Sequence, residues 1–248
     1  MISLFKQTIR FATLVAFLIT VLSCSNDDRN DTDTDNNPDS SGCTNPTDFA
    51  YEEKDGIVTV EFESIKELSG WEKNDSLQGF TGSKYLVWKG DQYLSNPGNG
   101  LLTYKIKINT PGTYRFIWRS QIAKGTEGSE HNDSWLRFGD ADRFYGKKNE
   151  SIIYPRDTGL TPNPNGASKD GWFKIYLSGA GTWKWQSRTS DNDAHDIYVE
   201  FNSPGIYTME VSARSSHHAL DRFTLFNETI NNENGTNDSN AISDIICN

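Results

Sequence analysis

LLTYKIKINTPGTYRFIWRS, residues 101–120 of this 248-residue chain, is the stretch that decides the fold. Every second residue from Leu102 to Ile108 is apolar, and the residues between them are polar or charged. In an extended strand this alternation places the apolar side chains on one face. Thr110-Pro111-Gly112 is a turn signal, and a second β-rich run follows it at residues 113–120. The stretch therefore predicts two strands joined by a turn.

Runs of the same kind, separated by turn signals, recur along the chain. They cover residues 57–63, 84–88, 101–108, 113–120, 134–138, 171–177, 182–186, 196–201, 206–213 and 219–226. No stretch carries the apolar stripe of an amphipathic helix. About ten short strands without helices predict an all-β fold, an antiparallel β-sandwich and most simply a jelly roll. The longest irregular segment, residues 139–170, is expected to be a functional or disordered loop.

The N-terminal segment has the features of an export signal. Lys6 and Arg10 precede an apolar stretch, residues 11–22, which is shorter than the ~20 apolar residues needed to span a bilayer. The stretch ends in Val-Leu-Ser-Cys, which resembles a bacterial lipobox. We therefore predict a lipoprotein signal peptide over residues 1–23 and lipidation of Cys24. The alternative is an ordinary secretory signal with a coincidental cysteine.

Residues 24–42 are expected to form a disordered linker that starts at the lipidated Cys24. The segment contains six Asp and no large apolar residue, so it cannot bury surface. An Asp-rich run at this place also resembles the surface-export signals of some Gram-negative lipoproteins, and a solvated spacer is the alternative. We expect an exported, lipid-anchored protein on the outer membrane, exposed at the cell surface.

The charge and the cysteines limit the function classes. With 34 acidic and 24 basic residues the net charge is −10, and nucleic-acid binding would need a basic surface instead. Once Cys24 is lipidated, Cys43 and Cys247 remain near the two ends of the expected domain, residues 43–248, which ends in an Asn-rich tail. In an oxidising compartment we predict a disulfide between them. It would add on the order of 4 kcal/mol of stability by constraining the unfolded chain.

Five short motifs occur in an order that points to a family. They are EFE at 61–63, GFTGSKYLV at 79–87, PGTYRF at 111–116, PGIY at 204–207 and LDRF at 220–223. This succession resembles the carbohydrate-binding modules of the family-6 and family-35 type, within the galactose-binding-domain-like β-sandwich group. The resemblance covers roughly residues 57–226. The chain departs from it by extra length near residues 124–171 and by Ala219, where such modules often carry a ligand-binding Asn.

The resemblance implies a noncatalytic glycan binder with a structural calcium ion. The residues at the corresponding positions are Glu61, Glu63 and Asp221. Side chains two apart on a strand share a face, and carboxylate oxygens are suitable ligands for Ca²⁺. The alternative is a set of acids that are solvated or that pair with Arg222 or Lys66.

Polar residues gather in three loops that each precede a strand, near residues 130–133, 191–196 and 214–218, and these loops contain all four histidines. If the loops share one rim of the sandwich, their side chains can bind sugar hydroxyls. The alternatives are ordinary turn residues, structural histidines, or a transition-metal pair at His217-His218. The predicted glycan-binding residues are Arg119, His131, Asn132, Asp133, Trp172, Asp193, His195, His217 and His218.

Seven tryptophans supply further candidates, because a flat ring can cover the apolar face of a sugar. Core burial is the alternative for each of them. Trp71 and Trp172 lie in Gly-rich surroundings and are expected to be the more exposed. Trp183 and Trp185 share one sheet face and form either a binding platform or part of the core.

The sequence gives little support for catalysis. It contains no GxSxG or Walker motif, and its acidic pairs Asp140/Asp142 and Asp191/Asp193 are adjacent only in sequence. We therefore predict noncatalytic polysaccharide or oligosaccharide binding by a membrane-anchored surface lipoprotein, with other surface proteins of glycan utilisation as partners. The alternatives are a polysaccharide hydrolase, a lyase that uses Arg119, His131 and Tyr145, and a structural or protein-interaction role.

Overall fold

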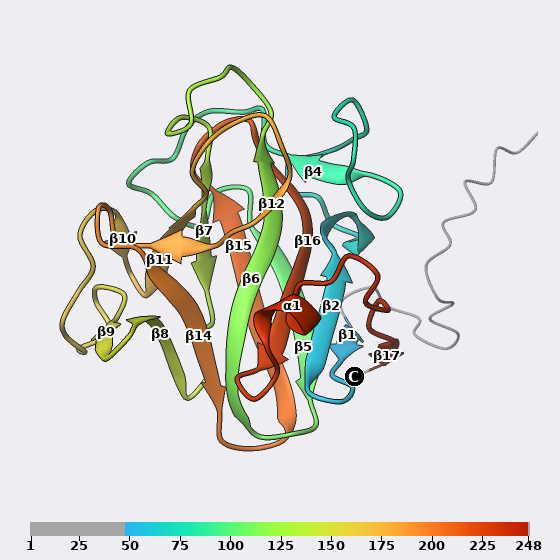
Figure 1. Cartoon of the computed structure of the whole chain (residues 1–248), viewed down its shortest axis with the longest axis vertical. Helices are drawn as coiled ribbons and strands as arrows, with labels where there is room; N and C mark the ends of the chain where they lie inside the picture. The colour runs from blue at the N-terminus through green and yellow to red at the C-terminus, as the bar shows by residue number, and fades with distance from the viewer. Residues whose placement is uncertain (1–47, 248) are drawn as a thin grey trace, which may run out of the picture. The chain divides into compact units, whose positions relative to one another are not determined.

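The computed structural model describes residues 48–247. The predicted signal peptide, the lipidated Cys24, the acidic linker and Cys43 lie outside the described residues. Within the described range the chain forms seventeen strands, a 3₁₀ turn (Phe62–Ser64) and one four-residue helix, α1 (Asn232–Gly235) (Figure 1). The predicted all-β fold is confirmed.

The strands build the two layers of a β-sandwich, and β13 (Arg188–Thr189) joins the layers along one side by pairing with a strand of each. The first layer consists of β3 (Glu72–Asn74), β4 (Tyr85–Val87), β2 (Ile57–Glu61), β16 (His218–Asn227), β6 (Gly112–Ile122), β12 (Lys184–Trp185), β14 (His195–Phe201), β8 (Arg143–Lys148) and β9 (Ser151–Ile153). The second layer consists of β17 (Ile245–Cys247), β1 (Phe49–Glu52), β5 (Leu102–Ile108), β15 (Gly205–Ala213), β7 (Asp133–Arg137), β11 (Trp172–Tyr176) and β10 (Ser168–Lys169). All the described pairings between strands are antiparallel except β1 with β5, which is parallel.

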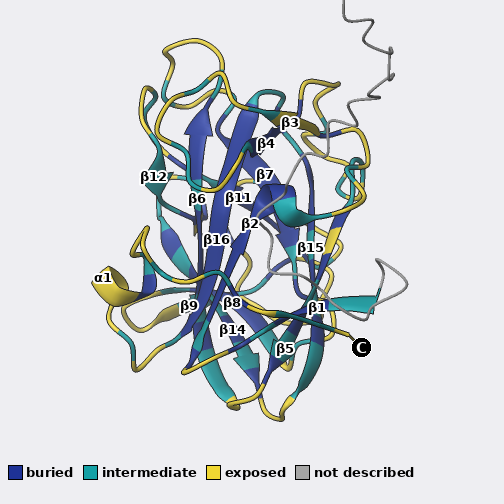
Figure 2. Ribbon diagram, turned by 90° about the vertical axis from the view of Figure 1, so that its right-hand side faces the viewer, coloured by how far each residue is buried: buried dark blue, intermediate teal, exposed yellow. Residues whose placement is uncertain are grey.

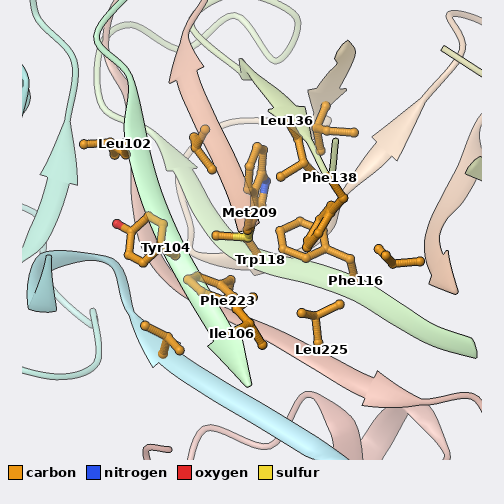
Figure 3. Packing of buried hydrophobic residues seen from close by; sticks show 14 of the residues in the cluster. Leu102, Tyr104, Ile106, Phe116, Trp118, Leu136, Phe138, Met209, Phe223 and Leu225 are labelled. Atoms are coloured by element: carbon orange, nitrogen blue, oxygen red, sulfur yellow. The ribbon is translucent and has the colours of Figure 1, made fainter. Parts of the chain in front are cut away.

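The hydrophobic core fills the space between the layers. Tyr104 and Met209 of the second layer face Trp118 and Phe223 of the first, and all four are fully or almost fully buried (Figure 3). The alternation predicted for residues 102–108 is confirmed, since every second side chain of β5 is buried. β16 and β6 lie at the centre of the first layer and are buried along most of their length (Figure 2).

The ten predicted strands are all present, but the expectation of an irregular segment at residues 139–170 is wrong, because β8, β9 and β10 lie within it. The pattern of β8 is hidden by Gly146 and by the charged residues after it. A side chain is excluded at Gly146, since a Cβ there would lie 2.9 Å from Ile153 and 3.1 Å from His195. Close packing of three strands thus selects a residue that sequence patterns associate with turns.

The two ends of the described chain lie side by side. β17 pairs antiparallel with β1, and Phe49 lies opposite Cys247. The Asn-rich C-terminal segment is therefore packed against the sandwich. Because Cys43 lies outside the described residues, its disulfide with Cys247 stays a prediction. Within residues 48–247 no helix has the length and apolar character of a membrane span.

Candidate functional site

A small group of aromatic and apolar side chains lies on the outer face of the first layer, separate from the core. We call it the outer patch, and it consists of Leu77, Phe80, Tyr85, Val87, Ala123, Trp183 and Ala219. The floor of the patch follows from strand register, since Val87 of β4 lies opposite Ala219 of β16, which lies opposite Gln121 of β6. Phe80 and Trp183 are only half-buried, so their rings are partly open to solvent.

Hydrogen bonds and ring contacts fix the aromatic side chains of the patch. The Tyr85 hydroxyl donates to Asn74 Oδ1 at 2.8 Å, and Trp183 Nε1 donates to the Gln78 carbonyl at 3.1 Å. The ring of Tyr85 meets those of Trp183 and Phe80 edge to face, with centroids 5.1 and 5.7 Å away. The two loops that carry Phe80 and Trp183 are thereby joined over β4. These contacts therefore preorganise the shape of the patch before a ligand binds.

Polar groups border the outer patch. The guanidinium carbon of Arg119 lies 5.7 Å from the centroid of Trp183, and Arg119 Nη2 donates to the Gly79 carbonyl at 2.8 Å. The amide oxygen of Gln121 is buried and has no hydrogen-bond partner. A buried polar atom without a partner is costly unless a water molecule or ligand completes it. Arg119 was among the predicted glycan-binding residues, whereas Gln121 was not.

The three carboxylates that the family resemblance assigns to calcium gather around the loop before β4. The backbone N–H of Thr81 donates to Asp221 Oδ1 at 2.9 Å, and its hydroxyl donates to Glu61 Oε2 at 2.9 Å. The backbone N–H of Ser83 donates to Glu63 Oε1, also at 2.9 Å. The loop that carries Phe80 of the outer patch is therefore held by these acids.

The carboxylates do not reach the loop in the predicted way. The expectation that Glu61 and Glu63 share the face of one strand is wrong, because β2 ends at Glu61 and Glu63 belongs to the 3₁₀ turn that follows. The turn sends Phe62 into the core, where it is fully buried. The two glutamates flank that anchor, and both side chains reach the same loop.

Burial sets the electrostatics of this cluster. Desolvation, reinforced by the negative charge of Glu61, raises the pKa of Glu63 to about 7. Desolvation also raises the pKa of Asp221 to about 6, although Arg119 acts in the opposite direction. Gly82 allows the close approach, since its φ is +65° and a Cβ there would lie 2.4 Å from Glu63 Oε1.

One oxygen of the three carboxylates has no partner and could bind a calcium ion, whereas arginines of the protein already bind other oxygens. Glu63 Oε2 is buried without a partner, which suits a hard cation. Arg222, however, binds Glu61 through Nε at 2.9 Å and through Nη2, and Arg119 Nη1 binds Asp221. Accordingly, no group of three or more acidic, His or Cys side chains within residues 48–247 is arranged as a ligand set. Of the three carboxylates, Glu63 is the one whose unpartnered oxygen a bound ion would satisfy.

Two of the four histidines meet at the rim next to the outer patch. The rings of His131 and His217 lie 5.5 Å apart, and His131 Nδ1 donates to the Ser216 carbonyl at 2.6 Å. Both residues have left-handed backbones, with φ of 55° and 64°. The carbonyl of His217 accepts from the N–H of Ala123 at 2.9 Å, which links the rim to the patch. Burial, followed by the charge of Lys124, lowers the pKa of His217.

The neighbours of these histidines in the sequence have internal partners. Asn132 donates to the Leu177 carbonyl at 2.7 Å, and Asp133 is bound by Arg214 and Ser215. Both are almost fully buried. His218 is also fully buried, and its Nδ1 lies 2.9 Å from Ser134 Oγ. These predicted binding residues are held inside the rim rather than displayed on it.

Three further predicted residues lie elsewhere. His195 is fully buried on β14 and bonds Ser151 of β9 at 2.8 Å, so the expectation of one rim for all four histidines is wrong. Asp193 pairs with Lys148 of β8 at 2.6 Å. The expected exposure of Trp172 is also wrong, because its side chain is buried in the second layer under Arg137, 4.6 Å from the ring.

Trp71 and the candidate lyase residues are likewise placed by their contacts. Trp71 is buried, against expectation, and donates from Nε1 to the Gly100 carbonyl at 2.7 Å. Tyr145 stacks on Tyr198 of β14, with centroids 5.8 Å apart, whereas Arg119 is held by Asp221. No described contact brings Tyr145, Arg119 and His131 together as a catalytic group.

Several solved structures resemble this chain, and two of them are carbohydrate-active enzymes. A GH26-CBM35 β-(1,4)-mannanase of Podospora anserina is 15% identical over 70% of this chain and 28% of its own, with a TM-score of 0.42. A cycloisomaltooligosaccharide glucanotransferase of a Paenibacillus species, complexed with cycloisomaltoheptaose, is 15% identical over 71% of this chain and 19% of its own, with a TM-score of 0.40. The chain thus spans less than a third of either protein.

No protein-family model matches the chain, and no curated protein matches it. At these levels of similarity the function must be inferred from the side chains of the chain itself. The outer patch is the feature that sequence reasoning did not assemble. Two of its parts carried a signal: Trp183, from the Trp183/Trp185 pair, and the GFTGSKYLV motif that supplies Phe80 and Tyr85.

Proposed function

We propose that this chain is a noncatalytic module that binds a polysaccharide or oligosaccharide through the outer patch. The observation that carries the proposal is the placement of Phe80 and Trp183. Both rings are half-buried on the outside of the sandwich, beside the buried and unpartnered amide oxygen of Gln121.

The chemistry of the patch suits a sugar ring. A flat aromatic surface covers the C–H face of a pyranose, and polar groups at its border bond the hydroxyls. Trp183 and Phe80 supply the surface, and Gln121, Arg119 and His217 supply the polar border. Ala219 lies on the floor of the patch and has a small side chain. The position that often carries a ligand-binding Asn in the family therefore leaves space for a ligand here.

Binding and catalysis are separated by one experiment. The chain is run in affinity electrophoresis against a panel of neutral and acidic polysaccharides, and each mixture is assayed for new reducing or unsaturated ends. Retention without new ends supports the proposal. New ends would make the chain a hydrolase or lyase, and absence of retention on every glycan would favour a structural or protein-interaction role.

Replacing Trp183 by alanine is expected to raise the Kd for the retained glycan about 30-fold, since a central aromatic contact contributes about 2 kcal/mol. Tyr198→Ala is the matched control, because Tyr198 is a half-buried aromatic residue on β14, outside the patch. Isothermal titration measures both variants. Equal affinity of Trp183→Ala and the wild type would contradict the proposed site.

We also propose calcium as a stabilising ion at Glu63, with Glu61 and Asp221 as further ligands. The bound ion would supply positive charge to the unpartnered Glu63 oxygen. Excess EDTA is then expected to lower the Tm by several degrees, because an ion at 100 times its Kd stabilises the fold by about 3 kcal/mol. In Glu63→Gln the effect of EDTA should disappear. An unchanged wild-type Tm in EDTA would show that the arginines alone balance the acids.

The anchor is part of the same proposal. Lipid on Cys24 would hold the module at the outer membrane, where it would deliver bound glycan to other surface proteins of glycan utilisation. Fractionation of cells should place the wild type with membranes and Cys24→Ser in the soluble fraction. A wild-type chain that is recovered without membranes would contradict the anchor and leave the binding site unaffected.

A further inference from the structure

Apart from the outer patch, the described residues line a cavity of about 200 Å³. It lies where β1 begins, beside β5 and the segment that follows the 3₁₀ turn. Phe49, Ile65 and Leu101 form apolar walls, and Ser64 and Thr103 add hydroxyl groups. None of the lining residues belongs to the outer patch.

Strand register explains why the cavity exists. β1 runs parallel to β5 with Ala50 opposite Lys105, so β1 begins only near the middle of β5. The first residues of β5, from Leu102 to Thr103, pair with β15 on one side and have no described strand on the other. The segment after the 3₁₀ turn borders the resulting gap. The space is therefore fixed by three elements of the sandwich.

Within residues 48–247 the lining of the cavity carries more positive than negative side chains. Among the described residues, the side chains of Lys66 and Lys105 form no ion pair or hydrogen bond. Glu67 is the one acid among the described residues that line the cavity. Lys66 and Glu67 are exposed, and Lys105 is half-buried. Two free ammonium groups beside one carboxylate leave the mouth with a net positive charge, which complements an anion.

We propose that this cavity binds one acidic sugar unit, with its carboxylate or sulfate group at Lys66 and Lys105 and its ring against Phe49. The volume is below the ~300–1,000 Å³ of sites that enclose drug-sized ligands, and it suits a single ring. The hydroxyl of Thr103 bonds the sugar hydroxyls, whereas the Ser64 hydroxyl already donates to the Glu61 carbonyl and bonds Tyr51. This inference rests on the proposed glycan-binding function for the kind of ligand and adds a second site to it.

The test measures the Kd of the full chain for three small probes by NMR titration. Methyl β-glucuronoside carries a carboxylate, galactose 6-sulfate carries a sulfate, and methyl β-glucoside is neutral. We expect at least one acidic probe to bind tenfold or more tightly than the neutral one. The double variant Lys66→Met/Lys105→Met should raise that Kd at least tenfold.

Two controls locate the effect. Lys107→Met removes the next outward-facing lysine of β5, which does not line the cavity, and Trp183→Ala disables the outer patch. Both should leave the Kd for the acidic probe within twofold. Because the exchanged lysines are at least partly exposed and unpaired, an unchanged Tm verifies that each variant is folded.

The outcomes separate this inference from the proposed function. Equal binding of the neutral and acidic probes, or an unchanged Kd in the double lysine variant, would overturn the cavity as an acidic-sugar site. Loss of the cavity site together with polysaccharide retention that depends on Trp183 would leave the proposed function standing. Lysine-dependent binding without any retention at the outer patch would support the cavity and overturn the patch.

Discussion

Replacing Arg222 by methionine is expected to lower the free energy of unfolding by about 3–5 kcal/mol, because the change leaves Glu61 buried without its counter-charge. The two residues lie opposite each other on β16 and β2, and their side chains are only 6% and 9% exposed. In a domain of this size the loss corresponds to a fall in Tm of about 10 °C. Urea denaturation measures this loss of stability. EDTA is added so that no divalent cation can take the place of the guanidinium group.

The double variant Glu61→Gln/Arg222→Met identifies the cause. If the lone buried carboxylate is responsible, removing its charge as well should recover most of the lost stability. Lys89→Met is the matched control, because it breaks an ion pair with Glu72 in which both side chains are 41% exposed or more. That loss should stay below about 1 kcal/mol. An Arg222→Met variant no less stable than Lys89→Met would contradict the role given to the buried pair.

His218 is expected to make the fold sensitive to acid. Its imidazole is fully buried against Trp118, with ring centroids 5.7 Å apart, and burial lowers its pKa to about 4. The charge of Asp133 raises the pKa and so acts in the opposite direction. The ring is therefore neutral in the folded state at pH values where a solvated histidine is charged.

The sign of the effect follows from proton binding. In the unfolded chain His218 has a pKa near 6.5, so as the pH falls the unfolded state takes up the proton first. The contribution to stability is complete above pH ~6.5 and is lost progressively as the pH falls towards 4. The shift corresponds to about 3 kcal/mol across that range.

His218→Gln removes this titration and retains a side chain that can bond Ser134. We expect the stability difference between wild type and variant to shrink by about 3 kcal/mol between pH 7 and pH 4, as measured by urea denaturation at each pH. The carboxylates titrate in both proteins, so their contribution to the pH dependence of stability cancels in this difference. Parallel stability curves over this range would exclude His218 as the origin of the acid sensitivity.

The strands that pack against the core on one face could be predicted from the sequence, and the short edge strands could not. Residues 102–108 alternate because one face of β5 is buried and the other is wet. β8 lies between β14 and β9 near an edge of the sheet. Its Gly146 allows close packing and its two lysines can be solvated, so the strand shows no regular alternation of apolar and polar residues. Its identity depends on neighbours that are distant in sequence.

The candidate site was predictable only in parts, because strand register brings its residues together from separate segments. His131 and His217 meet as the loops around them suggested, while the neighbouring Asn132 and His218 are consumed by internal hydrogen bonds. Local composition is the same in both cases. What separates a displayed polar side chain from a buried one is the register of the strand that follows it, and that is set by the whole sheet.

The pairing of β1 with β5 and β17 has a consequence for how firmly the start of the described chain is held. β1 is bonded on one edge to β17 and on the other to β5. A pull along β1 would load the hydrogen bonds on both of its edges in shear, all at the same time. Such an attachment yields only when several bonds break together, so β1 resists forced detachment more than a strand that is bonded on one edge alone.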